Sequence, residues 1–104
     1  MIKHVVMWKL KENANGASGL ENAKKIKQML EELTAKIEQI KYLQVGINEN
    51  TGDLSSYDAC LITVFDNIEE LDLYQNHPDH KAVSAFVAEV RESRAVVDFE
   101  VDAI

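Results

Sequence analysis

The chain has 104 residues, of which 46% are hydrophobic, and its 11 basic and 18 acidic side chains give a formal net charge of −7. This length supports one domain with a single core, and we expect residues 1–104 to form it. The acidic balance argues against binding to nucleic acids or anionic membrane surfaces, and no apolar run is long enough to span a membrane. A single cysteine, Cys60, excludes an internal disulfide. Without a Cys/His cluster, no metal and no other cofactor is expected, and the expected location is the cytoplasm.

The first expected strand, Ile2 to Lys11, alternates apolar and polar residues and does not resemble a cleaved signal peptide. One face of it carries His4, Val6, Trp8 and Leu10. The segment NANGASG that follows is typical of a turn and offers Ser18 as a helix N-cap. From Leu20, apolar residues recur every three or four positions, which predicts a long amphipathic helix. These positions are Leu20, Ala23, Ile26, Leu30, Leu33 and Ile37.

Two further expected strands, Lys41 to Glu49 and Tyr57 to Phe65, are separated by the loop NTGDLSS. Asp66 is then the expected N-cap of a short helix. The apolar positions of this short helix are Ile68, Leu71 and Tyr74.

A last helix and a last strand complete the expected order. The helix begins after Pro78, and its apolar positions are Val83, Phe86, Val87 and Val90. The strand runs from Ala95 to Val101. The order strand–helix–strand–strand–helix–strand predicts a ferredoxin-like α+β fold with one antiparallel sheet.

Two helices can cover only one face of such a sheet, but both faces carry apolar residues. The residues expected on the uncovered face are Val5, Met7, Ile62 and Val64. An apolar face needs a covering, and a second copy of the chain is the simplest one. We therefore expect a homodimer in which two sheets pack face to face.

The stretch YQNHPDH contains two of the three histidines and the only proline. Proline is favoured at the first position of a helix, which makes His77 the N-cap and His80 the third helical residue. His80 is in register with the apolar stripe of its helix and is expected to point at the sheet. The helix N-terminus and partial burial disfavour an imidazolium there, so His80 is expected to be neutral and able to act as a general base. Tyr74 precedes it and could aim its hydroxyl at the same space.

His4 is the third candidate, because it shares its strand face with Val6 and Trp8. Asp98 of the last strand would lie on the same face for one strand register, and it would then fix the tautomer of His4. Val6, Trp8, Asp98 and Phe86 are candidates for the binding surface.

The same residues also have a structural interpretation. His77 is then only a helix cap, and His80 and Tyr74 are core polar residues that lock the corner between two helices. Trp8 and Phe86 belong to the core in that interpretation. Cys60 is expected to be an inert buried thiol, because its strand is strongly apolar.

Three segments together resemble the stress-responsive α/β-barrel (Dabb) family over essentially the whole chain: IKHVVMWKLK, SYDACLITVFDNIEELDLYQNHPDHKAV and VVDFEV. The resemblance implies a dimeric α/β barrel. The family includes a plant polyketide cyclase, olivetolic acid cyclase, which uses the Tyr and the last His of a Y-x-x-HP-x-H block for an aldol ring closure. Tyr74 and His80 match those positions, and His4 matches a histidine on the first strand of the cyclase.

The chain departs from the cyclase at other positions. Ala59 stands where the cyclase has a further pocket histidine, and Ala23, Lys24 and Lys27 replace larger residues of its alkyl pocket. The resemblance therefore implies that the Tyr/His pair is retained and that the substrate differs.

Two functions of different classes remain open. One is a cofactor-independent cyclase or isomerase, in which His80 is the base and Tyr74 stabilises an enolate oxygen. The other is a non-catalytic stress-response module that binds a small-molecule ligand or protects other molecules. A haem-degrading or quinol monooxygenase is disfavoured by the HPDH block.

Overall fold

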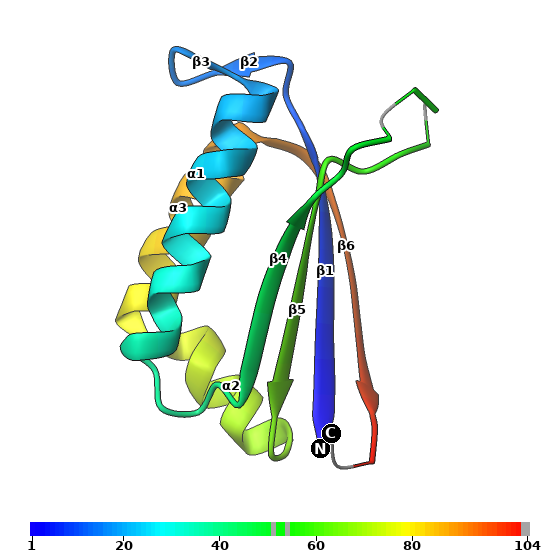
Figure 1. Ribbon diagram of the computed structural model, residues 1–104. Helices are drawn as coiled ribbons and strands as arrows, with labels where there is room; N and C mark the ends of the chain where they lie inside the picture. Colours follow the sequence, from blue (N-terminus) through cyan, green and yellow to red (C-terminus); the bar gives the residue numbers. More distant parts are fainter. Residues whose placement is uncertain (51, 54, 103–104) are drawn as a thin grey trace.

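The computed structural model describes residues 1–50, 52–53 and 55–102. Its main sheet has four antiparallel strands in the order β4-β5-β1-β6 (Figure 1). These strands are β1 (Ile2–Leu10), β4 (Tyr42–Ile47), β5 (Ala59–Phe65) and β6 (Arg91–Glu100). The helices α1 (Gly19–Glu32), α2 (Ile68–Asn76) and α3 (Pro78–Val90) lie on one side of the sheet (Figure 1). The ferredoxin-like α+β fold expected from the sequence is confirmed. Thr51 and Leu54 of the expected loop lie outside the described residues.

β1 organises the sheet, because it pairs with β5 on one side and with β6 on the other. The alternating pattern of β1 correctly predicted which residues face the helices. These buried residues are His4, Val6, Trp8 and Leu10. In the observed register His4 lies between Thr63 of β5 and Asp98 of β6.

α1 begins at the expected N-cap. The Ser18 hydroxyl oxygen accepts the main-chain N–H of Glu21 at 3.1 Å, and the Glu21 carboxylate accepts the N–H of Ser18 at 3.0 Å. The turn before it closes a small hairpin, β2 (Asn13–Ala14) and β3 (Ala17–Ser18). Asn15 and Gly16 at its tip both have positive φ angles, 52° and 73°, as an Asn-Gly hairpin turn requires. After α1, a short 3₁₀ helix (η1, Leu33–Ala35) continues the chain.

The corner between α2 and α3 is built by His77 and Pro78. His77 is extended, with φ −65° and ψ 134°, and its Nδ1 accepts the N–H of Asp79 at 3.1 Å. Pro78 occupies the first helical position, where a missing N–H costs nothing. Both expectations for this corner are confirmed.

Three details of the helices differ from the sequence-based expectation. The cap of α2 is Asn67, whose side-chain oxygen accepts the N–H of Glu70 at 2.9 Å, and not Asp66. Leu20 and Ile68 are exposed. They lie in the first turns of α1 and α2.

β6 begins at Arg91, before the expected start at Ala95. In the pairing with β1, Trp8 lies opposite Arg94 and Leu10 lies opposite Arg91, with a shift of register between Lys9 and Leu10. Two β6 residues lie between the arginines, whereas one β1 residue lies between Trp8 and Leu10. This is a β-bulge. The extra residue interrupts the alternation, so the sequence pattern does not reveal this part of the strand.

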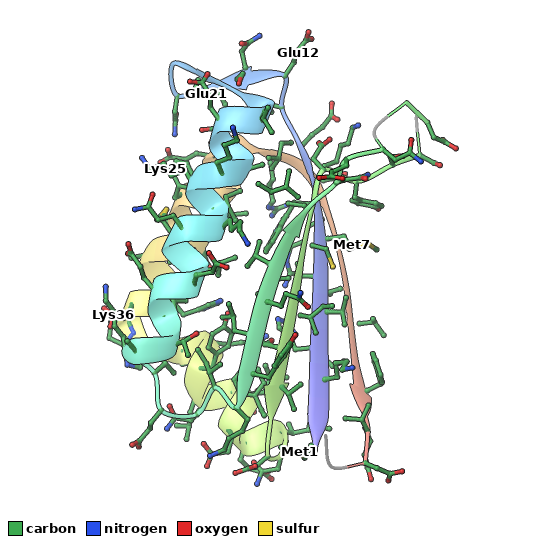
Figure 2. All side chains as sticks on the ribbon, viewed as in Figure 1. Met1, Met7, Glu12, Glu21, Lys25 and Lys36 are labelled. Atoms are coloured by element: carbon green, nitrogen blue, oxygen red, sulfur yellow. The ribbon has the colours of Figure 1, made fainter. Side chains whose placement is uncertain are left out.

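The sheet face away from the helices is partly apolar and open. Its exposed large apolar residues are Met7, Tyr42, Val97 and Phe99, at 37%, 42%, 53% and 42% exposure (Met7 in Figure 2). Val5 and Ile62 are half-buried. Val64 is fully buried and flanked by its paired neighbours Lys3 and Tyr42, so the expectation that Val64 is exposed in one subunit was wrong.

The opposite face of the sheet forms the core with α1 and α3. Ile26 and Leu30 of α1 and Val87 of α3 pack there with residues of β1 and β5. Each fully buried side chain of this size contributes about 1.5–3 kcal/mol. No helix in the described part of the chain is long and apolar enough to cross a membrane.

Candidate active site

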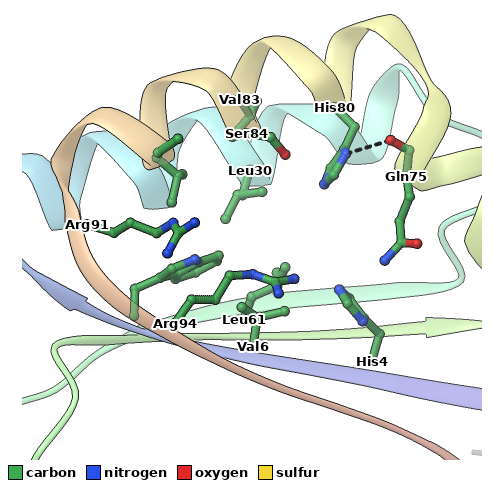
Figure 3. Close-up of a pocket in the computed structure, with 13 residues that line it drawn as sticks. His4, Val6, Leu30, Leu61, Gln75, His80, Val83, Ser84, Arg91 and Arg94 are labelled. Carbon is green, nitrogen blue, oxygen red and sulfur yellow. Dashed lines mark hydrogen bonds between the residues drawn. The ribbon is translucent and has the colours of Figure 1, made fainter.

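A cavity of about 320 Å³ lies between α3 and the helix-facing side of the sheet (Figure 3). Val6, Trp8 and Leu61 provide apolar lining from the sheet. The polar residues around it are His4, Gln75, His80, Ser84, Arg91 and Arg94. At about 30 Å³ for each water-sized group, the cavity accommodates about ten non-hydrogen atoms. It is therefore large enough for a small organic molecule.

His80 enters the cavity from the first turn of α3. Its Nδ1 lies 3.2 Å from the main-chain oxygen of Gln75 (Figure 3). A carbonyl oxygen only accepts hydrogen bonds, so Nδ1 carries the proton and Nε2 keeps a lone pair. Figure 3 shows that this second nitrogen points away from Gln75 toward the cavity.

The surroundings of His80 favour its neutral form. Burial is the main cause that lowers the pKa of His80 below its ordinary value of 6.5, and electrostatic interactions with His4, Arg94 and His77 lower it further. The hydrogen bond to Gln75 acts in the opposite direction but does not reverse the shift. At pH 7 His80 is thus a neutral imidazole with a free lone pair on the cavity side.

His4 lies on the sheet side of the same cavity. Its side chain is buried, and its Nδ1 is hydrogen-bonded to Oδ1 of Asp98. The paired positions of β1 and β6 bring these two residues together. Asp98 does not line the cavity. It orients the imidazole of His4, as a carboxylate behind a histidine does in many enzymes.

Tyr74 lies next to both histidines but is fully buried. Its ring centroid is 4.3 Å from that of His80 and 6.3 Å from that of His4, and it also packs against Phe65. Burial raises the pKa of Tyr74, so the hydroxyl stays protonated. That hydroxyl has no hydrogen-bond partner among the described residues. Tyr74 is absent from the cavity lining, in contrast to the expectation that its hydroxyl points into the same space.

The remaining candidates divide between the cavity and other places. Val6 and Trp8 line the cavity. Phe86 does not, because it faces α1, where the Lys25 ammonium lies 4.8 Å from its ring centroid. Cys60 is half-buried, and burial raises the pKa of its thiol.

Two lining residues, Arg91 and Arg94, were not predicted from the sequence. They are the only arginines of the chain, and this clustering of one residue type within four positions is visible in the sequence. Their spacing of three would place them on opposite faces of a regular strand. The bulge in β6 adds one residue between them, so both side chains lie on the helix-facing side and line the cavity.

No group of three or more His, Cys, Asp or Glu side chains within residues 1–50, 52–53 and 55–102 could hold a metal ion. The polar groups of the cavity are instead suited to hydrogen bonding and proton transfer. They comprise two imidazoles, an amide, a hydroxyl and two guanidinium groups.

Comparison with known proteins shows the family of the chain. A structure from Bacteroides fragilis, described as a dimeric protein of unknown function with a ferredoxin-like fold, is 36% identical with a TM-score of 0.85 and covers 96% of this chain and 95% of its own. A dimeric ferredoxin-like protein of unknown function from Thermobifida fusca is 23% identical (TM-score 0.80, covering 96% and 90%).

The hydroxynitrile lyase of Passiflora edulis shares the fold at 12% identity, with a TM-score of 0.80 and coverage of 99% and 94%. No curated protein matches the chain. The model of the stress responsive A/B barrel domain matches residues 2–101. The chain therefore belongs to the stress-responsive α/β-barrel (Dabb) family.

Proposed function

We propose that this protein is a cofactor-independent catalyst of proton transfer next to a carbonyl group, of the cyclase or isomerase type, with His80 as its base. The observation that carries the proposal is the state of His80. Its Nδ1–H is engaged by Gln75, its pKa is lowered, and its free Nε2 faces a cavity of the size of a small molecule. A general base requires a lone pair of this kind within reach of the substrate, and such a base contributes about 10²–10⁴-fold to a rate.

In the proposed reaction, Nε2 of His80 takes a proton from the carbon next to a carbonyl, and an enolate forms. The positive charge that appears on the ring is stabilised by the hydrogen bond from Nδ1 to Gln75. The proton then returns to a neighbouring carbon in an isomerisation, or to the new alkoxide oxygen after carbon–carbon bond formation in an aldol cyclisation. His4, oriented by Asp98, faces the substrate from the sheet side and is the candidate partner of its oxygen.

Tyr74 has two possible roles in this scheme. Its unpartnered hydroxyl would donate to the enolate oxygen if a substrate reached between the histidines. Alternatively, its ring only positions His80, which it contacts at 4.3 Å between centroids. Tyr74→Phe separates the two roles, because it removes the donor and keeps the ring. A fall in kcat of about 10²-fold or more supports the first role, and an unchanged kcat supports the second.

The experiment for the proposed function follows hydrogen–deuterium exchange by NMR in a panel of small enolisable ketones and oxo acids. We expect the protein to accelerate exchange at the carbon next to the carbonyl, and we expect His80→Ala to abolish the acceleration while the fold is kept. Lys81→Gln is the matched control, because Lys81 is exposed on the same helix and does not line the cavity. If no member of the panel exchanges faster than with His80→Ala, the proposal is wrong.

The second candidate function is a non-catalytic binding module, and the position of Tyr74 favours it. Of the Tyr/His pair, only His80 lines the cavity, so the arrangement also fits a pocket whose buried tyrosine serves the packing of the corner. Saturable ligand binding without any acceleration of exchange would favour this function.

We also propose that the protein is a homodimer that pairs the open faces of two sheets. Met7, Val97 and Phe99 would otherwise remain exposed on that face. The Bacteroides fragilis relative, at 36% identity, is described as dimeric. Face-to-face sheet packing would bury the apolar patch of each copy against the same patch of the other.

A further inference from the structure

Both arginines of the chain line one cavity, and the other basic residues are all lysines. The guanidinium group of arginine is a planar fork of N–H donors that matches a carboxylate with two parallel hydrogen bonds, whereas lysine acts as a point charge. Two arginines at one cavity therefore indicate a site for a planar anionic group, which a surface of scattered lysines would not indicate.

The backbone brings the two arginines together by a specific device. Arg91 lies opposite Leu10 and Arg94 lies opposite Trp8, and both of these β1 residues are buried on the helix-facing side. Without the bulge between them, Arg91 and Arg94 would lie on opposite faces of β6. Bulges that re-aim a side chain are over-represented next to active sites. Figure 3 shows both side chains reaching over the cavity.

The charges around the cavity are unbalanced. The chain carries a net charge of −7, but no acidic residue lines this cavity. Neither arginine forms an ion pair with another described residue, and the nearby carboxylate of Asp98 is engaged by His4. Arg94 is close enough to His80 for its charge to lower the pKa of that residue. The cavity thus offers two cations that form no ion pair with another described residue.

The positions of these groups define two ends. In Figure 3, His80, Gln75 and His4 lie at one end of the cavity and the Arg91 guanidinium lies at the other, while the Arg94 side chain extends over Leu61 toward His4. A molecule of about ten non-hydrogen atoms would extend between the ends. A carboxylate takes three of those atoms and leaves room for a reacting carbon skeleton.

We propose that the cavity binds a small organic carboxylate, whose carboxylate group is held by Arg91 and Arg94 while its carbon skeleton extends over the apolar lining toward His80. This inference rests on the proposed function for the identity of the reacting end, and it defines the substrate class as small oxo acids. The binding part stands on the arginines alone and can be tested without turnover.

The test compares benzoate with benzamide, which has the same size and shape but no charge. Binding to the intact protein is measured by calorimetry and by chemical-shift changes at constant ionic strength. We expect benzoate to bind at least about tenfold more tightly than benzamide, as charge-assisted hydrogen bonds imply. Arg94→Gln and Arg91→Gln are each expected to weaken benzoate binding about tenfold and to leave benzamide binding unchanged.

Two variants keep this result interpretable. Arg94→Lys retains the charge and is expected to keep part of the preference for benzoate, which excludes a loss of folding as the cause. Lys81→Gln removes one positive charge from the outer surface of α3 and is expected to change nothing. Phenyl phosphate serves as the competing anion, and tighter binding of phenyl phosphate than of benzoate would contradict the assignment to carboxylates.

The proposal is overturned if benzamide binds as tightly as benzoate, if neither binds at millimolar concentration, or if Lys81→Gln weakens benzoate as much as the arginine variants do. Failure of the proposed function gives a different result. In that case benzoate binds through the arginines as expected, but no oxo acid exchanges its protons faster than with His80→Ala.

Discussion

His80 donates its Nδ1–H to the main-chain oxygen of Gln75, five residues earlier and on the other side of the α2–α3 corner. This bond satisfies a carbonyl at the end of α2, where the helix itself offers no partner. It also decides which nitrogen of His80 is left free. The structural and the chemical interpretations of the histidine stretch therefore do not exclude each other, because one hydrogen bond serves both.

The lowered pKa of His80 predicts acid sensitivity of the fold. In the unfolded chain His80 takes up a proton near its ordinary pKa of 6.5, whereas in the folded chain it does so only at lower pH. Between these two pKa values the unfolded chain binds more protons, so the free energy of unfolding falls as the pH falls. Above pH 6.5 His80 is mostly neutral in both the folded and the unfolded chain, so the site no longer reduces the free energy of unfolding. Melting curves from pH 8 to 5 should show a steeper loss for the native protein than for His80→Gln. Equal slopes for the two proteins would contradict the shift.

His77 is predicted to be a helix cap and nothing more. His77→Ala removes the acceptor for the Asp79 N–H and should cost about 1 kcal/mol, which lowers the melting temperature of a domain of this size by about 4–8 °C. His77→Asn should recover most of this loss, because asparagine is a good cap. Exchange activity should be unaffected by His77→Asn. A loss of activity in the Asn variant would assign chemistry to His77.

Asp98 is predicted to act through His4. Asp98→Asn keeps the shape of the side chain but removes the charge that orients the imidazole, so proton exchange should slow by about tenfold or more. The fold should be retained, since Asp98 lies on an edge strand and is partly exposed. Asp72→Asn, an exposed position on α2, is the control for loss of one negative charge. Equal rates for Asp98→Asn and Asp72→Asn would remove His4 from the mechanism.

Val96 and Val97 offer a matched pair for the proposed dimer. They are neighbours in β6 and are similarly exposed, at 48% and 53%, but they lie on opposite faces of the sheet. Val97→Lys places a charge on the open face and should give monomers in analytical ultracentrifugation. Val96→Lys should leave the dimer intact. Dissociation by both variants, or by neither, would contradict face-to-face pairing of the sheets.

The sequence predicted the fold where local patterns determine it. Alternation in β1 placed His4 on the core face, and proline chemistry placed Pro78 at the start of α3. The register between β1 and β6 depends on pairing across the whole chain, so the contact between His4 and Asp98 could only be expected for one register.

Two other features could not be inferred, because they depend on three-dimensional packing. The bulge that aligns Arg91 with Arg94 has no hydrophobic signature, since the residues around it are polar. The burial of the Tyr74 hydroxyl follows from how α2 packs against the sheet, which helical periodicity alone does not give.

The ¹⁵N NMR shifts of the His80 ring, followed from pH 8 to 5, test the central claim most directly, because the proposed base must be neutral and must carry its proton on Nδ1. The account predicts a neutral ring at pH 7 with protonated Nδ1 and unprotonated Nε2, and a midpoint of titration below 6.5. A ring that is already an imidazolium at pH 7, or a neutral ring with its proton on Nε2, would contradict it.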